Sequence, residues 1–347
     1  MGRNTLGWTS VAVALVTTLQ VTRAGAQPRG LAPSDYYAEI GVGEVAVSPA
    51  GSLLAFTVTT IDEARNERHR EVWLQPLRGG RPDGEASRFT NQTSDASSPR
   101  WAPSGRVLSF RSHRGDDAND IWFARVTVPG GEAYHIEGVT AAPVWSRDGE
   151  WIAFTHSTET GADQGDADTN RNGWIAPDAI TTTLDASRFD GRVITSMRYK
   201  RDGTLTLLPH QTAEPITQLM VVAAGGGDPA LLTSLPFDVS DPAWSDDGSH
   251  IFFVGDEQQH NERSRDLNQD LYVVSRDGGE PRKLTSNPGS EFTPVVSPGG
   301  KQLAFLYRRD RGSPTDLKIV DLRPDGTFAG PPRTLTNEWD LVPGRPS

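Results

Sequence analysis

The sequence predicts an all-β protein, a β-propeller of four-stranded antiparallel blades, and three observations point to this fold class. A short phrase of turn residues occurs six times, and apolar runs of strand length follow the copies. Glycine and proline are abundant, with 35 and 25 among 347 residues. Many short strands joined by tight turns require such a composition, and repetition with a period of about 40 to 50 residues is typical of propeller blades.

The recurring phrase begins with an aromatic residue or valine and ends with glycine, and in four of the six copies the second residue is serine. Its copies are Val47–Gly51, Trp101–Gly105, Trp145–Gly149, Tyr199–Gly203, Trp244–Gly248 and Val296–Gly300. The first residue ends a strand, Ser-Pro or Ser-Asp starts a turn, and glycine supplies the positive φ that closes it. Each copy therefore predicts a hairpin, in six blades that begin near residues 45, 99, 143, 193, 242 and 294.

The other strands of each blade are also visible in the sequence. Second strands are expected at Leu53–Phe56, Val107–Phe110, Ile152–Phe154, Leu205–Leu208, Ile251–Phe253 and Leu303–Phe305. Third strands are expected at Glu71–Leu74, Asp120–Phe123, Gln218–Val221, Asp270–Val273 and Asp316–Ile319, and glycine turns then precede short outer strands such as Arg282–Thr285. We interpret the tryptophan, aspartate and glycine residues of the phrase as scaffold residues that build the blades.

The first 26 residues read as a signal peptide, followed by the propeller over residues 27–347. Arg3 supplies positive charge, Val11–Leu19 is apolar but too short to span a bilayer, and Ala24-Gly25-Ala26 is a cleavage pattern. We expect cleavage after Ala26 and export to the periplasm or the medium, with no membrane attachment afterwards. The alternative is a permanent membrane anchor, but Thr17, Thr18 and Gln20 interrupt the apolar run.

Composition excludes several classes of function. A formal net charge of -11 disfavours nucleic acid as a partner, because such binders usually present concentrated positive charge. The absence of cysteine removes disulfides, thiolate metal sites and cysteine nucleophiles. The seven histidines have no close ligand spacing, and no Gly-x-Ser-x-Gly elbow is present. We therefore expect no catalytic residues and no cofactor, although a Ser-His-Asp triad assembled from separate blades stays open.

One polar segment is a candidate for a calcium site. Asp168, Asn170 and Asn172, with Gly173 at the sixth position, match the first half of a calcium-binding loop. The second half does not match, because Ala179 occupies the position where a bidentate carboxylate is expected. A weak calcium site and an ordinary polar loop insertion are both compatible with this sequence, and no other metal site is predicted.

Arginines are concentrated in the loops between second and third strands, on the face opposite the hairpins. Arg111, Arg265 and Arg309 represent this group. Guanidinium groups suit carboxylate recognition, so one hypothesis is a rim that faces a peptide or another domain. The alternative is that these side chains pair with neighbouring acidic residues such as Asp266 and Asp310.

Several segments carry a resemblance to known exported propellers. The Trp-Ser-Pro-Asp-Gly phrases followed by Ile-Ala-Phe resemble TolB-like propellers and those of prolyl oligopeptidase-type serine peptidases. Leu31–Tyr37 followed by Val45–Pro49, together with Val193–Tyr199, resembles the propeller of the acylaminoacyl-peptidase and dipeptidyl-peptidase branch. The resemblance implies a non-catalytic propeller that gates or positions peptides for a C-terminal α/β-hydrolase domain. The alternative is a TolB-like periplasmic scaffold that binds a protein ligand.

The resemblance also predicts an incomplete ring. Trp339-Asp340 and Pro346-Ser347 are similar to the lead-in of another blade, and propellers of this family usually have seven. We therefore expect a fragment of a serine peptidase, truncated before its last blade and its hydrolase domain. An incomplete ring would expose sheet edges that favour aggregation or pairing with a partner.

Overall fold

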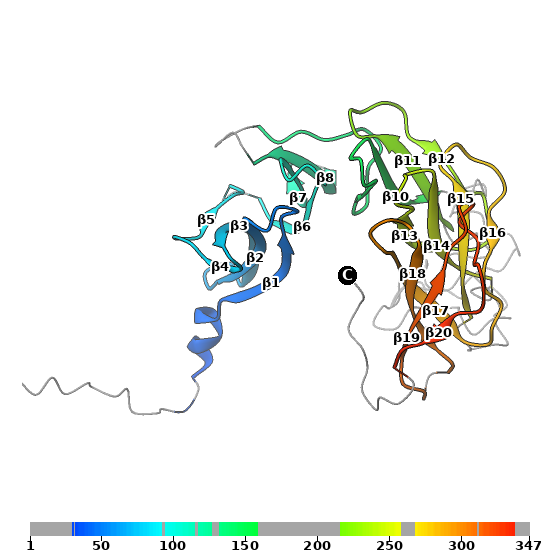
Figure 1. Ribbon diagram of the computed structural model, residues 1–347. Coiled ribbons are helices and arrows are strands. Elements are labelled where there is room, and N and C mark those ends of the chain that lie inside the picture. Colours follow the sequence, from blue (N-terminus) through cyan, green and yellow to red (C-terminus); the bar gives the residue numbers. More distant parts are fainter. Residues whose placement is uncertain are drawn as a thin grey trace, which may run out of the picture.

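The computed structural model is an arc of antiparallel sheets, and it describes residues 30, 32–91, 94–114, 117–126, 132–158, 216–257, 268–310 and 312–336. A short 3₁₀ helix, η1 (Pro33–Ala38), precedes the first strand. Five sheets then follow one another along the chain (Figure 1). The prediction of an all-β propeller built from antiparallel blades is confirmed.

The first three sheets cover the part of the chain up to Leu231. The first contains β1 (Gly41–Val47), β2 (Leu53–Asp62), β3 (Glu67–Arg78), β4 (Arg81–Pro82) and β5 (Ser87–Arg88). The second contains β6 (Ala96–Trp101), β7 (Val107–Arg114) and β8 (Asp117–Arg125). The third contains β9 (Val144–Trp145), β10 (Trp151–Thr158), β11 (Ile216–Ala223) and β12 (Ala230–Leu231).

The fourth and fifth sheets each have four strands in sequence order. The fourth contains β13 (Val239–Trp244), β14 (His250–Asp256), β15 (Gln269–Ser275) and β16 (Arg282–Lys283). The fifth contains β17 (Ser290–Val296), β18 (Gln302–Arg308), β19 (Asp316–Asp321) and β20 (Arg333–Thr334).

The predicted hairpins form at five copies of the phrase. In the first, the Gly51 amide donates to the Ser48 carbonyl over 2.8 Å, and Gly51 has a φ of 66°. The Ser48 hydroxyl accepts the Leu53 amide at the start of the next strand. The copies that begin at Trp101, Trp145, Trp244 and Val296 close through the same glycine bond. The phrase therefore determines the turn locally, as its residue types predict.

The third sheet differs from the sequence prediction in one strand. The sequence places Gln218–Val221 in a unit that begins near residue 193, but these residues lie in β11, which pairs with β10 of the unit that begins near residue 143. An alternating apolar pattern identifies a strand but not its partner, which contacts distant in sequence select. The fourth copy of the phrase, Tyr199–Gly203, lies outside the described residues.

Side chains of neighbouring sheets pack into a hydrophobic cluster at each of the four junctions between the described sheets. Val72 and Phe110 belong to the cluster between the first and second sheets, and Phe123 and Phe154 to the cluster between the second and third. Leu219 and Phe253 belong to the cluster between the third and fourth sheets, and Phe252 and Phe305 to the cluster between the fourth and fifth. Successive residues of one strand contact the sheets on opposite sides, because side chains alternate between the two faces of a sheet. The core of the protein is therefore the series of contacts between blades.

Polar contacts along the first strands connect the blades at regular positions. The indole nitrogen of Trp101 donates to the Ala46 carbonyl over 3.0 Å, and that of Trp244 donates to the Val144 carbonyl over 2.9 Å. The first strands of the first, second, fourth and fifth sheets also contain a bulge with a residue at positive φ. These residues are Glu44, Ser98, Asp241 and Thr293. Glu44 accepts the Ser98 amide and Asp241 accepts the Thr293 amide, so the bulges connect adjacent blades.

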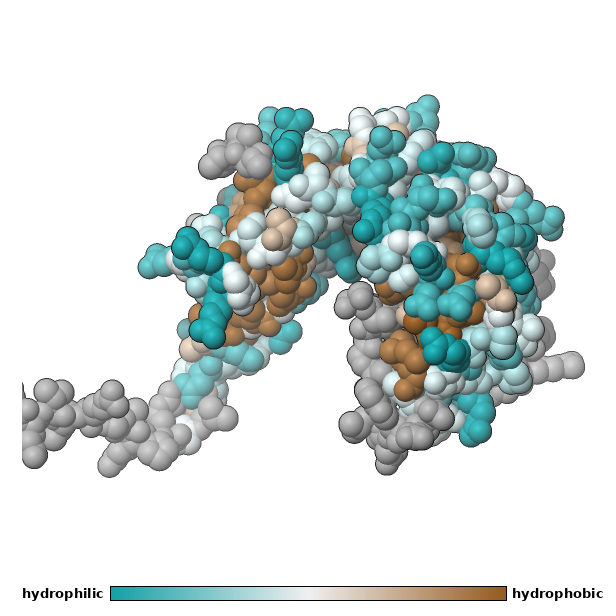
Figure 2. Space-filling model, in the orientation of Figure 1, coloured by the Kyte–Doolittle hydropathy of each residue, from teal (hydrophilic) through white to brown (hydrophobic). Residues whose placement is uncertain are grey.

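The two outermost sheets of the arc have a neighbouring sheet on one side only, as far as the described residues go. Val42, Val45 and Val47 of β1 are exposed by 66%, 60% and 56%. Figure 2 shows apolar side chains gathered on the first sheet, on the left of the view. No hydrophobic cluster of the described residues joins the first sheet to the fifth. The first sheet therefore presents an apolar face that no other described sheet covers.

Candidate functional site

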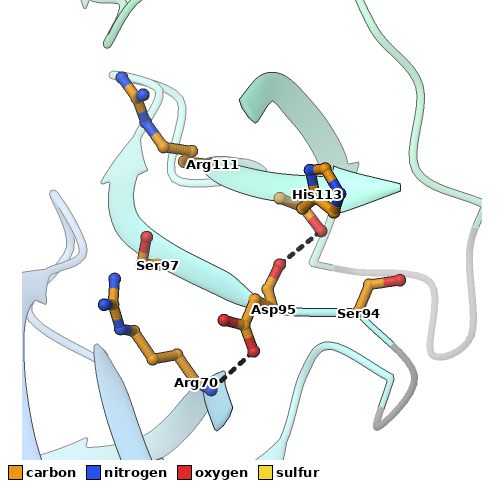
Figure 3. A pocket seen from close by; sticks show the side chains of 7 residues that line it. Arg70, Ser94, Asp95, Ser97, Arg111 and His113 are labelled. Carbon is orange, nitrogen blue, oxygen red and sulfur yellow. Dashed lines mark hydrogen bonds between the residues drawn. The ribbon is translucent and has the colours of Figure 1, made fainter. Parts of the chain in front are cut away.

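A cleft of about 410 Å³ opens between the first two sheets, at the end of the blades opposite the hairpins. Arg70 enters it from β3, Ser97 from β6 and Arg111 from β7 (Figure 3). The complete lining is Arg70, Ser94, Asp95, Ser97, Arg111, Ser112 and His113. The cleft is thus lined by hydroxyl and charged side chains from two blades, and its size falls within the range of ligand sites, roughly 300 to 1,000 Å³.

Asp95 has the largest number of hydrogen bonds in this cleft. Its Oδ1 accepts the Arg70 amide over 3.1 Å and lies 2.8 Å from Nδ1 of His69. Its backbone carbonyl accepts the Ser112 hydroxyl over 2.8 Å and the His113 amide over 3.2 Å. Because both the side chain and the backbone of Asp95 are held, the carboxylate has a fixed position at the junction of the two sheets.

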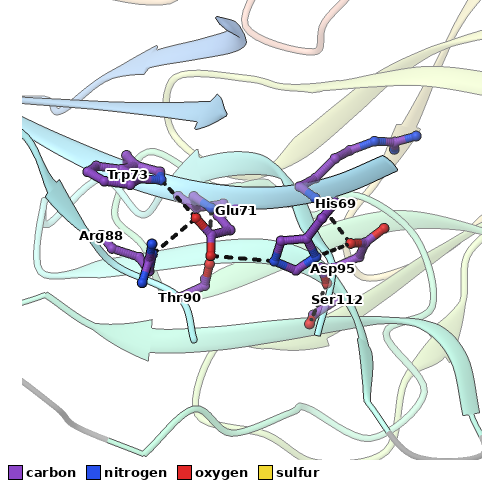
Figure 4. Close-up of polar contacts among 9 residues, drawn as sticks. His69, Glu71, Trp73, Arg88, Thr90, Asp95 and Ser112 are labelled. Carbon is purple, nitrogen blue, oxygen red and sulfur yellow. Dashed lines mark hydrogen bonds and ion pairs between the residues drawn. The ribbon is translucent and has the colours of Figure 1, made fainter. Parts of the chain in front are cut away.

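A larger open cleft of about 1130 Å³ adjoins the first and shares Asp95 with it. Glu71 is its most buried charged group, with 7% of its surface exposed. Its Oε2 accepts Nε of Arg88 over 3.0 Å and the indole nitrogen of Trp73 over 3.3 Å (Figure 4). Nε2 of His69 lies 3.4 Å from Oε1 of Glu71. His69 therefore stands between two carboxylates, those of Glu71 and Asp95.

This arrangement does not activate a nucleophile. The Ser112 hydroxyl donates to the backbone carbonyl of Asp95, and no serine hydroxyl of the described residues is hydrogen-bonded to His69. An activated serine would need a hydrogen bond to the imidazole that removes its proton. The His69 cluster therefore connects the first and second sheets, and among the described residues no hydroxyl is hydrogen-bonded to its imidazole.

The charge of Arg70 also acts on the neighbouring Glu44. Burial alone would raise the pKa of the Glu44 carboxyl, but hydrogen bonds from Thr57 and Ser98 and the positive charge of Arg70 lower that pKa below its ordinary value. The Glu44 oxygens accept Oγ1 of Thr57 over 2.7 Å and the Ser98 amide over 2.7 Å. The carboxylate is thus already engaged by neutral donors, and its effect on Arg70 is exerted through space.

A second polar cluster lies between the fourth and fifth sheets. Glu291 is completely buried, and burial raises the pKa of its carboxyl to about 7, with the nearby charge of Asp270 acting in the same direction. Asp270 is also buried and pairs with Nζ of Lys283 over 2.8 Å, yet burial raises its pKa as well. The Thr285 hydroxyl lies 3.2 Å from Oδ1 of Asp270 and 3.4 Å from Oε2 of Glu291.

The three arginines singled out from the sequence have different surroundings. Arg111 lines the smaller cleft beside Arg70. Arg309 donates to Oδ2 of Asp310 over 3.2 Å, which is the ion pair that the alternative interpretation predicts. Arg265 lies outside the described residues, as do the calcium candidates Asp168, Asn170 and Asn172 and the predicted signal peptide, residues 1–26. The described part of the chain contains no group of three or more His, Asp or Glu side chains arranged to hold a metal.

Sequence reasoning did not identify His69, Glu71 or Asp95 as members of one cluster. A weak signal exists, because a polar residue occupies the start of the third strand in several blades, as Glu71, Gln218, Asp270 and Asp316. In the structure, the backbone amide of the residue that follows each of these polar residues donates to a threonine hydroxyl near the outer strand of the same blade. One example is the Val72 amide, which donates to Thr90.

No helix of the described residues has the length and hydrophobicity that crossing a bilayer requires.

Comparison with known proteins relates the chain to peptidases. Residues 157–312 match the family model described as the dipeptidyl peptidase IV N-terminal region. The uncharacterized peptidase YuxL of Bacillus subtilis is 25% identical over 243 residues, which cover 69% of this chain and 33% of the relative. Dipeptidyl-peptidase 5 of Porphyromonas gingivalis is 25% identical over 291 residues, which cover 81% of this chain and 40% of the relative. The chain thus spans about a third to two-fifths of the length of these relatives.

Solved structures agree on the fold. The acylaminoacyl peptidase of Pyrococcus horikoshii superposes with a TM-score of 0.57 at 16% identity, covering 89% of this chain and 41% of the peptidase. The β-propeller domain of the trilobed protease from Pyrococcus furiosus superposes with a TM-score of 0.53 at 12% identity, covering 88% of this chain and 74% of that domain. The chain is therefore a β-propeller, and its residues 157–312 match the model of the dipeptidyl peptidase IV N-terminal region.

Proposed function

We propose that this chain is the non-catalytic propeller of an exported peptidase of the prolyl oligopeptidase type and that it admits and positions peptides for a hydrolase domain. The family match over residues 157–312 is the observation that carries the proposal. The curated relatives are named as peptidases and are more than twice as long as the matched part, so their chains have room for a further domain.

The smaller cleft, between the first and second sheets, supports a role in peptide binding. It combines arginine, serine and histidine side chains with the carboxylate of Asp95, and it lies at the end of the blades opposite the hairpins. Polar groups placed at fixed positions in a concave surface orient a ligand. A peptide that contacts these groups would be held at one end of the propeller.

Peptide binding by the 347-residue chain tests this function. We expect a dye-labelled decapeptide of mixed sequence to bind saturably in a fluorescence anisotropy titration, and a small folded protein with the same dye to remain unbound. Size selection of this kind is what a gate produces. If neither probe binds, the gating function is wrong; if the folded protein binds and the peptide does not, a TolB-like protein-binding scaffold replaces it.

Export is a second part of the proposal and can be measured separately. We expect the protein recovered from the periplasm or the medium of a producing bacterium to begin at Gln27, because Ala24-Gly25-Ala26 fits the small-residue pattern of signal peptidase cleavage. Intact-mass spectrometry of the purified product gives the N-terminal residue. A product that begins at Met1 and fractionates with membranes would instead support the permanent anchor.

A further inference from the structure

Two guanidinium groups in the cleft between the first and second sheets have no hydrogen-bond or ion-pair partner among the described residues. Within the part of the chain that the structure describes, the side chains of Arg70 and Arg111 form no ion pair and no hydrogen bond. Other arginines do find carboxylates: Arg88 pairs with Glu71, and Arg147 pairs with Asp246. Other described arginines, such as Arg81 and Arg100, also form no ion pair, and what distinguishes Arg70 and Arg111 is that both line one cleft.

The two groups face one open cleft, where a ligand could reach both of them. Both side chains line one concave site, and Ser97 lies along the same side of the cleft as the two arginines (Figure 3). The acidic residue that acts on Arg70, Glu44, already accepts bonds from Thr57 and Ser98. Guanidinium forks beside a hydroxyl match the oxygens of a carboxylate or phosphate.

Asp95 restricts the chemistry of that ligand. Its Oδ1 is occupied by the Arg70 amide and His69, while Oδ2 accepts no donor from the described residues. An oxygen with this geometry would accept an N–H group and would repel a second concentrated negative charge. A phosphate dianion therefore fits this site poorly. A carboxylate with a neighbouring amide N–H fits it well, because the carboxylate can bind the arginines and the N–H can donate to Asp95.

We propose that this cleft binds the C-terminal end of a peptide, with Arg70, Arg111 and Ser97 binding the terminal carboxylate and Asp95 accepting the N–H of the last residue. The inference rests on the proposed function and specifies which end of the peptide the propeller holds. A cavity of about 410 Å³ accommodates the final residues of a chain and not a folded domain.

The test uses two forms of one peptide with the complete 347-residue chain. An N-terminally dye-labelled Gly-Ala-Gly-Ala tetrapeptide is prepared with a free C-terminal carboxylate and as its C-terminal amide, and each form is titrated by fluorescence anisotropy. We expect the free acid to bind at least about tenfold more tightly than the amide, because charge-assisted hydrogen bonds are lost in the amide. Acetate should displace the free acid, and inorganic phosphate at equal concentration should be the weaker competitor.

Substitutions locate the effect in the cleft. R111Q and R70Q should each weaken binding of the free acid about tenfold and leave binding of the amide unchanged, and R111K should lie between the wild type and R111Q. The matched control is R106Q, which removes the same charge from an exposed position in the hairpin between β6 and β7 and should leave both affinities unchanged. Thermal unfolding followed by circular dichroism verifies that each variant remains folded.

The outcomes separate this inference from the proposed function. A free acid that loses its advantage in R111Q and R70Q supports the C-terminal site. Equal binding of acid and amide, or an acid preference unchanged in both variants, overturns the site and leaves peptide gating in place. Displacement by phosphate more than by acetate overturns it in favour of a phosphate site, and the absence of binding by either peptide overturns both proposals.

Discussion

Replacing Phe154 with alanine is expected to lower the free energy of unfolding by about 3 to 5 kcal/mol, the usual cost of removing a buried phenylalanine ring. Phe154 lies in β10 with none of its surface exposed, in the cluster that joins the third sheet to Phe123 of the second. Its removal would leave a cavity at a junction between blades, where the core of the protein lies. Urea unfolding followed by circular dichroism at constant pH measures the change.

Phe56 provides the matched control for this prediction. It lies in β2 next to Ala55, which packs toward the second sheet, so the Phe56 ring lies on the opposite and uncovered face. We expect F56A to cost about 1 kcal/mol, because a partly exposed ring loses less contact than a buried one. A cost for F56A equal to that of F154A would show that another surface covers the first sheet. A cost for F154A below about 1 kcal/mol would contradict the described junction.

The hairpins could be predicted from sequence because their determinants are local. A serine, a glycine with positive φ and the first residue of the next strand all lie within a few positions, as in Ser48, Gly51 and Leu53. Turn formation depends on these residues alone, so each copy of the phrase can be interpreted without knowledge of the rest of the chain. Stacking of the blades follows from the repetition and from the apolar strands.

The partner of β11 could not be predicted in this way. Ile216–Ala223 has a strand pattern, but its neighbour in the sheet, β10, ends at Thr158, far earlier in the sequence. Sequence spacing favours a partner in the nearest repeat. The pairing observed places Leu219 and Val221 toward the fourth sheet, so contacts between blades and not local propensity select the register.

The candidate site was predictable only in part for a related reason. The sequence predicts that Arg111 lies in a loop of an arginine-rich rim, whereas the structure places it within β7, where it lines a cleft. His69 and Asp95 are 26 positions apart and meet only because the first and second sheets pack against each other. A pairing between blades of this kind has no signature in residue spacing, and the same is true of Glu291 and Asp270.

The buried carboxyl group of Glu291 predicts a specific pH dependence of stability. Its pKa rises from the usual 4.5 to about 7 in the folded protein. Between these values the folded state holds a proton that the unfolded state has lost. The contribution of Glu291 is therefore fully present below about pH 4.5, and it is lost as the pH rises through 7. The loss amounts to about 3 kcal/mol.

Comparison of the wild type with E291Q isolates this contribution. Glutamine has a similar shape and stays neutral, so the free energy of unfolding of E291Q should fall less between pH 4.5 and pH 8 than that of the wild type, by about 3 kcal/mol. Asp270 and Lys318 remain in both proteins, so the difference between the two profiles reports the charge of Glu291 together with its interaction with these neighbours.

The control for E291Q is E280Q, which removes the same charge from an exposed position and should keep the slope of the wild type. Urea unfolding curves at several pH values give the free energies for all three proteins. If E291Q and the wild type have parallel pH profiles, Glu291 is not protonated in the folded protein and the junction between the fourth and fifth sheets admits water. A difference that grows with pH from 4.5 to 7 locates the proton at Glu291, because burial between two packed blades is what favours the neutral form there.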